Sequence, residues 1–163
     1  MTRLVVDTNV PVIANGRNTN VSVECRLAAI DLLHELIHSG QTVLDLGGAI
    51  QEEYHVHLNP HGQPGVGDRF YQMILNSAPT RVERISLPID PHTGEYVDFP
   101  SDPALNDFDR SDRKFAAAAR RGQSPVANAT DSDWLHFRPA LNANGIEIMF
   151  VCGCDQAKWT VGP

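Results

Sequence analysis

The spacing of apolar residues alternates between two patterns along the chain. Short runs rich in β-branched residues are typical of buried strands, and longer stretches with apolar residues three and four apart are typical of amphipathic helices. The short runs predict strands at residues 4–6, 42–46, 82–87, 125–130 and 146–151. The longer stretches predict helices at residues 22–39, 49–58, 68–77 and 109–121, with a short helical stretch at 134–141 that Pro139 interrupts. This alternation indicates an α/β fold, a three-layer α/β/α sandwich with a central parallel sheet in the order 3-2-1-4-5.

One connection is much longer than the others. Residues 88–107 carry prolines among acidic residues, whereas 59–67 is a short turn-rich stretch. A loop of this length inside a compact domain is typical of a functional segment. The chain has no internal repeat, and its 163 residues are enough for one domain to bury its own core. We therefore expect a single domain over residues 1–163 with a long acidic loop.

Composition narrows the class of protein. Hydrophobic residues make up 42% of the chain and charged residues 20%, which is ordinary for a soluble protein. Neither a membrane-spanning run nor a signal peptide is present, so we expect no membrane partner. The net charge of -7 argues against a protein that coats nucleic acid, but an enzyme that gathers carboxylates around metal ions can be acidic. An odd number of cysteines favours a reducing, cytoplasmic compartment, and the Cys152–Cys154 pair lacks the further ligands of a zinc site.

Acidic residues collect at one edge of the predicted sheet. Asp7 follows the first strand and Asp131 follows the fourth, and in a parallel sheet the chemistry lies at the carboxyl ends of the strands. The helices that begin at this edge carry further acids: Glu52, Glu53, Asp109 and Asp112. Two such charges about 4 Å apart repel by roughly 4 kcal/mol at an effective dielectric near 20, so a cation must offset them. Carboxylates without thiolates or clustered imidazoles favour Mg²⁺ or Mn²⁺ over zinc.

These acids fall into ordered motifs. The motifs are Asp7-Thr8-Asn9-Val10, the acidic helix with Glu52-Glu53, Asp112 before Phe115-Ala116-Ala117-Ala118-Ala119, and Thr130-Asp131-Ser132-Asp133-Trp134. Together they resemble the PIN domain, a family of metal-dependent nucleases that are usually ribonucleases and include toxins. The resemblance extends over nearly the whole chain. It implies an acidic quartet that binds Mg²⁺ or Mn²⁺ for phosphodiester hydrolysis. The quartet would consist of Asp7, Glu53 with Glu52 as its alternative, Asp112 and Asp131.

The resemblance also implies roles around the quartet. Asp133 would be a further metal residue that supports the site from behind, and Thr8 or Asn9 would tether the backbone of the first motif or a bound water. Asp109 shares a helix face with Asp112 and is a further supporting residue. We expect the nucleic acid backbone to contact basic residues on or near that helix: Arg110, Arg113, Lys114, Arg120 and Arg121. RNA is expected ahead of DNA as the substrate, and a homodimer and an antitoxin or other regulatory partner are further expectations.

Two departures from the family pattern keep other hypotheses open. The family often has a threonine where Ala129 stands, and the loop at 88–107 is longer than usual. A PIN-like domain that binds RNA or protein without cutting is therefore the second hypothesis. A phosphatase of the haloacid dehalogenase type is the third, because that family also has an aspartate after its first strand. It needs a second aspartate where Asn9 stands and a lysine between Lys114 and Asp131, and this sequence has neither.

Overall fold

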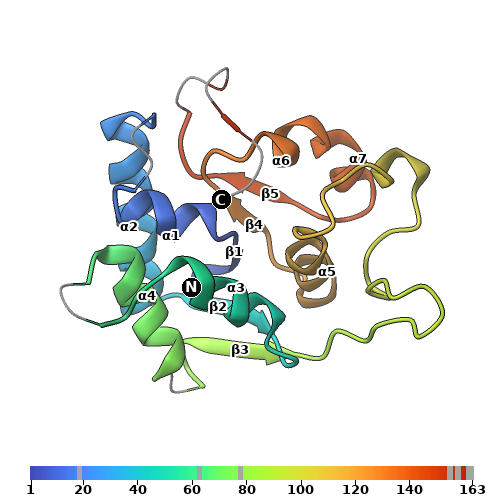
Figure 1. Ribbon diagram of the computed structural model, residues 1–163, viewed down its shortest axis with the longest axis horizontal. Helices are drawn as coiled ribbons and strands as arrows, with labels where there is room; N and C mark the ends of the chain where they lie inside the picture. The colour runs from blue at the N-terminus through green and yellow to red at the C-terminus, as the bar shows by residue number, and fades with distance from the viewer. Residues whose placement is uncertain (18–19, 62–63, 77–78, 154–155, 157–158, 161–163) are drawn as a thin grey trace.

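Five parallel strands form the central sheet in the computed structural model, which describes residues 1–163 except 18–19, 62–63, 77–78, 154–155, 157–158 and 161–163 (Figure 1). The strands are β1 (Arg3–Val6), β2 (Gln41–Asp45), β3 (Val82–Ile85), β4 (Val126–Asn128) and β5 (Ile148–Phe150). They lie in the order β3-β2-β1-β4-β5, and every neighbouring pair is parallel. The predicted strand order is confirmed. Since β1 lies between β2 and β4, its carboxyl end is at the centre of the sheet edge.

Helices cover both faces of this sheet, as predicted for a three-layer α/β/α fold (Figure 1). They are α1 (Asn9–Ala14), α2 (Val23–His38), α3 (Ala49–His57), α4 (Val66–Leu75), the 3-10 turn η1 (Pro103–Leu105), α5 (Arg113–Gly122), α6 (Ser132–His136) and α7 (Arg138–Ala143). The helices α1, α2 and α4 pack against one another, whereas α5 packs against the strands β1 to β4. The helix α3 contacts both α4 and α5. It therefore lies between the two helical groups, next to the carboxyl end of β2.

A face of small residues brings α5 close to the sheet. Phe115 and the four alanines 116–119 are buried, and so are Val5 and Val6 of β1. Strands that are buried on both faces are what a parallel sheet between two helical layers requires. Because α5 runs back across the sheet before β4 begins, its first residues lie at the carboxyl edge of the strands. This packing places the start of α5 beside the end of β1.

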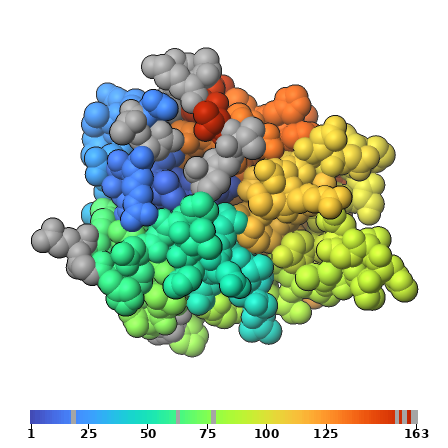
Figure 2. Space-filling model, in the orientation of Figure 1, coloured from blue at the N-terminus to red at the C-terminus, as the bar shows by residue number. Residues whose placement is uncertain are grey.

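The long connection between β3 and α5 is an ordered segment. Ile89 and Tyr96 form an antiparallel bridge, and the N–H of Asp90 donates to the carbonyl of Glu95 at 2.8 Å. Gly94 takes a φ of 72°, which an L side chain rarely adopts, and so allows the tight turn between them. Figure 2 shows residues 88–107, in yellow and yellow-green, projecting from the body of the domain. The predicted long loop is therefore a hairpin followed by η1.

Three predicted helical segments differ from the structure. The helix predicted at 109–121 begins at Arg113, because Asp109 Oδ1 accepts hydrogen bonds from the N–H and hydroxyl of Ser111 at 2.8 Å and holds a turn there. The stretch at 134–141 is two helices, with Pro139 in the first turn of α7, where proline is tolerated. The six-residue helix α1 was not predicted. The helix predicted at 68–77 begins earlier, at Val66, and its predicted end lies outside the described residues.

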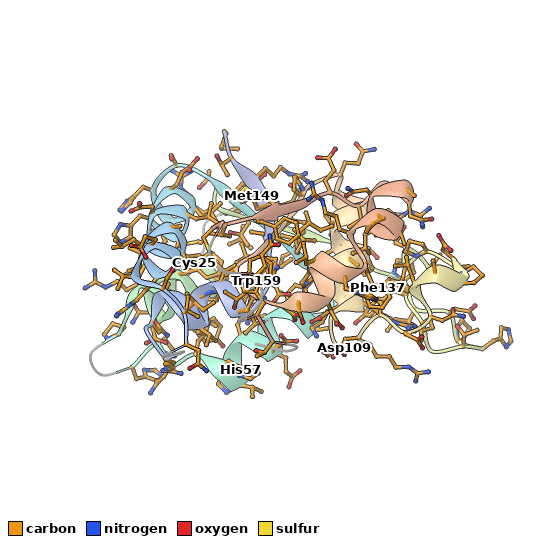
Figure 3. All side chains as sticks on the ribbon, turned by 90° about the horizontal axis from the view of Figure 1, so that it is seen from above. Cys25, His57, Asp109, Phe137, Met149 and Trp159 are labelled. Carbon is orange, nitrogen blue, oxygen red and sulfur yellow. A yellow bond between two sulfur atoms is a disulfide. The ribbon has the colours of Figure 1, made fainter. Side chains whose placement is uncertain are left out.

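Cys25 and Cys152 form a disulfide bond that joins α2 to the segment after β5. Cys25 is fully buried, and Figure 3 shows it on α2. The odd cysteine count therefore gives no support to a reducing compartment, and Cys152 is not available for a zinc site. Cys154 lies outside the described residues. In the part of the chain that the structure describes, the helices are too short or too polar to cross a membrane.

Candidate metal centre

Three buried aspartates from separate elements meet at the carboxyl edge of the sheet. Asp7 follows β1, Asp131 follows β4, and Asp112 directly precedes α5. Each offers one carboxylate oxygen, and these oxygens lie within 4.8 Å of one another. Their exposed fractions are 2% for Asp7, 4% for Asp112 and 1% for Asp131. The structure thus brings together three of the four acids of the predicted quartet and removes them from bulk water.

Asp7 is held from two sides. The indole Nε1–H of Trp134 donates to Oδ2 at 2.5 Å, and the backbone N–H of Asn9 donates to Oδ1 at 3.1 Å. Burial, and after it the negative charge of Asp131, raises the pKa of Asp7 from 3.8 to about 7. The two donors oppose this rise without cancelling it. Trp134 was not predicted as a site residue, although its place at the end of the last acidic motif was a signal for such a role.

Asp112 is the most strongly perturbed carboxyl group of the centre. Burial is the largest cause, and the charges of Asp7 and Asp131 follow; together they raise the pKa of Asp112 from 3.8 to about 10. Its Oδ2 is buried and has no hydrogen-bond partner among the described residues. An isolated buried carboxylate oxygen costs folding free energy unless a donor or a cation compensates it. Asp112 therefore has the surroundings of a group that binds a cation.

Two buried asparagines join the first and last motifs. Asn9 Nδ2 donates to Asn128 Oδ1 at 2.7 Å, and Asn9 Oδ1 accepts the N–H of Ala129 at 2.8 Å. Asn128 accepts the N–H of Asp131 at 3.2 Å and donates to its carbonyl at 3.1 Å. Asn9 therefore tethers the last motif rather than the first. Asn128 was not predicted as a site residue, and the signal was its position as the polar end of an otherwise apolar strand.

The helix α3 directs Glu53 toward the three aspartates and leaves Glu52 exposed. Thr8 Oγ1 donates to Glu53 Oε1 at 2.6 Å, and the ammonium of Lys114 forms an ion pair with Oε2. The charge of Glu53 is also one of the causes that raise the pKa values of Asp7 and Asp112. Glu53 thus lies beside the centre with its own charge compensated, and Thr8 supports it rather than the backbone of the first motif.

Asp112 also belongs to a second acidic group, nearer the surface. Its oxygen lies within 4.8 Å of carboxylate oxygens of Asp109 and Asp133. Burial, and after it the charge of Asp109, raises the pKa of Asp133. The N–H of Asp133 donates to Asp131 Oδ1 at 2.9 Å, so the two groups are directly connected. Asp109 lies at the lower edge of the view in Figure 3. Both predicted supporting acids therefore adjoin the centre.

The predicted basic residues have different surroundings. Arg113 is buried, where Nη1 pairs with Glu95 at 2.9 Å and Nη2 donates to the carbonyl of Asn106 at 2.9 Å. Lys114 pairs with Glu53, as described above. The exposed ones are Arg110, Arg120 and Arg121. Arg113 therefore holds the long loop in place, and only the exposed arginines present their charge to a ligand at the surface.

The residues present fit a hard divalent cation. Both acidic groups consist of carboxylates, and oxygen ligands without thiolate or imidazole suit a hard cation. Two unit charges 4.8 Å apart repel by about 3.5 kcal/mol at an effective dielectric of 20. A dication would offset this repulsion and so allow the three carboxyl groups, of which Asp7 and Asp112 have raised pKa values, to be ionised together. Asp7, Asp112 and Asp131 could thus hold a metal ion.

Similarity to known proteins does not add to this description. Comparison of the chain with family models gives no match, and neither does comparison with curated proteins or with solved structures. The buried aspartates and their surroundings are therefore the features of this chain that bear on its function.

Proposed function

We propose that the protein is a metal-dependent nuclease that hydrolyses phosphodiester bonds and, in line with its resemblance to the PIN domain, an endoribonuclease that uses Mg²⁺ or Mn²⁺. One observation carries this proposal: Asp7, Asp112 and Asp131 gather buried carboxylate oxygens within 4.8 Å, and Oδ2 of Asp112 has no hydrogen-bond partner among the described residues. Aspartates that serve only the fold are normally buried with donors that satisfy them. The parallel sheet supports the same function because its carboxyl edge is the usual place for a ligand.

The chain contributes orientation and charge to the proposed reaction. A divalent cation at the three aspartates would polarise the scissile phosphate, lower the pKa of a water and stabilise the leaving oxygen. Trp134 fixes the direction of one oxygen of Asp7, and the Asn9–Asn128 pair keeps the ends of β1 and β4 together. These contacts set the separation of Asp7 and Asp131 before substrate arrives, so that little reorganisation is needed.

Exposed arginines between Arg110 and the end of α5 supply the contacts with the nucleic acid backbone in this proposal. Arg110 lies two residues before Asp112, and Arg120 and Arg121 lie at the far end of α5. Arg121 comes nine positions after Asp112, which corresponds to roughly 13 Å along the helix at 1.5 Å per residue. Phosphates on both sides of a scissile bond can therefore meet positive charge, although the chain as a whole carries -7.

A second function is favoured by the surroundings of Glu53. One of its oxygens accepts from Thr8 and the other pairs with Lys114, so the fourth acid of the quartet is engaged within the protein. A PIN-like domain that binds RNA or a protein without cutting would tolerate this arrangement. The two functions differ in whether a metal ion supports turnover.

The deciding experiment compares cleavage of labelled single-stranded RNA and DNA with Mn²⁺, with Mg²⁺ or with excess chelator. The purified protein is tested beside Asp7→Asn and beside Asp31→Asn, an exposed aspartate of α2 that serves as the matched control. We expect metal-dependent cleavage of RNA by the parent and the control, and none by Asp7→Asn. If the folded parent binds RNA and leaves it intact under every metal condition, the non-catalytic function replaces the nuclease.

A further inference from the structure

A cavity of about 340 Å³ lies between the long loop and the start of α5, apart from the acidic centre. Residues of the hairpin, of the segment up to Asn106 and of the start of α5 line it, among them Asp90, Glu95, Tyr96, Phe99 and Arg113. Its volume is within the range of pockets that hold small planar ligands. The lining combines aromatic rings with carboxylates and hydroxyls, which is typical of a site that fixes the orientation of a ligand through a few polar groups.

One wall of the cavity is formed by planar groups: Phe99 and Arg113 line it, and Phe108, which lies outside the lining, stacks on Phe99. The rings of Phe99 and Phe108 are stacked, with centroids 6.0 Å apart, and the guanidinium carbon of Arg113 lies 4.7 Å from the centroid of Phe99. Arg113 is fixed in turn by Glu95 and by the carbonyl of Asn106. Planar groups already ordered in this way lower the entropic cost of stacking a further planar ligand beside them.

The charges of the lining decide which planar ligand fits. Asp90 and Glu95 line the cavity, and Arg113, the one cation among the described residues of the lining, is already paired with Glu95. A phosphate or other anion would be repelled by these carboxylates, so the ligand must present N–H donors. Asp90 Oδ1 accepts the N–H of His92 at 2.8 Å, and a carboxylate has further lone pairs for a ligand.

Among the nucleobases, guanine presents two neighbouring N–H donors on its Watson–Crick edge, at N1 and at the exocyclic N2. A carboxylate can accept both at once, as it does from the fork of an arginine. Adenine and cytosine place an acceptor beside their amino group, and uracil places a carbonyl on each side of its N–H, so none of them offers this pair. The carboxylate-lined cavity therefore suits guanine among the four bases.

Arginines next to the cavity suit the phosphate of a nucleotide. Arg120 Nη1 donates to the carbonyl of Asp98 at 3.3 Å, and Arg121 lies 3.7 Å from its carboxylate, so both arginines adjoin the loop that forms the cavity. Arg113 directly follows Asp112 of the acidic centre. We propose that this cavity is a nucleobase pocket that selects guanine next to the scissile position; its place in cleavage rests on the proposed nuclease function, whereas base binding itself needs no metal.

The test measures binding of guanosine, adenosine, cytidine and uridine 5′-monophosphates to the full chain in excess chelator, by calorimetry and by NMR shifts of the loop amides. Since the phosphate is common to all four probes, differences among them report the base. We expect guanosine monophosphate to bind at least tenfold more tightly than the others. Asp90→Asn should reduce that binding about tenfold, because the amide oxygen can still accept from His92 but no longer offers a carboxylate to the base.

A second variant keeps the proposal testable if Asp90→Asn disturbs the hairpin. Ser101→Trp adds bulk at an exposed lining residue and should abolish binding without lowering the melting temperature. Equal binding of the four nucleotides, no binding, or binding unchanged in both variants overturns the pocket. Guanosine binding without metal-dependent cleavage would refute the nuclease and leave the pocket standing. Metal-dependent cleavage without any base preference would refute the pocket and leave the nuclease standing.

Discussion

Replacing Asp112 by asparagine should stabilise the protein in chelator and remove its response to metal. The pKa of Asp112 is about 10 when folded, against 3.8 ordinarily, so at pH 7.5 the metal-free folded protein holds a proton that the unfolded chain has released. Over about 3.7 pH units, at 1.36 kcal/mol per unit, that difference costs about 5 kcal/mol of folding free energy. Asparagine carries no such cost, and its amide can donate to the neighbouring carboxylates of Asp7 and Asp131.

Even half of this cost in folding free energy is measurable. A gain of about 2 kcal/mol raises the melting temperature of a chain of this size by roughly 4–8 °C. The assay is thermal unfolding by circular dichroism at pH 7.5, with chelator and with Mn²⁺ or Mg²⁺. Wild type should gain stability on adding metal, by about 2.7 kcal/mol at a hundredfold excess over the dissociation constant, whereas Asp112→Asn should gain far less.

The exposed Asp31→Asn is the matched control, and it should behave as the wild type does in both conditions. A lower melting temperature of Asp112→Asn in chelator would show that the carboxyl group serves the fold rather than a cation. A full metal response in the variant would refute the placement of the ion at these three aspartates.

Three further predictions concern the acidic centre and the disulfide bond. The pKa values of Asp7 and Asp112 are raised, so these groups favour the metal-free folded state below pH 4, and this contribution to stability is lost as the pH rises through 7 and toward 10. The urea concentration at the midpoint of unfolding, measured in chelator, should therefore fall between pH 5 and 8. A constant midpoint over this range would contradict the prediction. Trp134→Phe removes the donor to Asp7 and should weaken Mn²⁺ binding about tenfold in a fluorescence or calorimetric titration, with the fold preserved; unchanged affinity would assign Trp134 to packing alone. Cys25→Ser opens the bond to Cys152 across 127 residues and should cost about 2–4 kcal/mol in urea unfolding, whereas reductant should then have no further effect.

The strands could be predicted because each is a local apolar run, and the meeting of Asp7 with Asp131 could be predicted once the strands were placed in the order 3-2-1-4-5, which is common in parallel α/β sheets. The apolar runs are local, and the carboxyl ends of neighbouring parallel strands meet wherever the sheet forms. The start of α5 was predicted less well. Asp109 bonds Ser111 and holds a turn, so that Asp112 precedes the helix instead of lying within it. Local side-chain bonds of this kind compete with helix formation, and periodicity does not record them.

The contacts that orient the centre join residues far apart in the chain. Asn9 and Asn128 are 119 residues apart, and Trp134 is 127 residues from Asp7. Such pairs depend on rotamers and on the distance between finished elements, neither of which is encoded in a local pattern. The disulfide between Cys25 and Cys152 was not predicted for the same reason, because the number of cysteines does not show which of them are adjacent in the folded chain.

The disulfide also changes what a break in the chain would do. Cys25 and Cys152 lie on opposite sides of the projecting hairpin in sequence, so a protease that cuts at exposed Val97 opens the backbone without releasing either piece. The amino-terminal piece would carry Asp7, and the other would carry Asp112 and Asp131. While the bond is oxidised, a nicked molecule keeps its acidic centre within one covalent unit. Once the disulfide bond is reduced, the acidic centre of the nicked molecule depends on the two fragments remaining associated, and dilution alone can separate them.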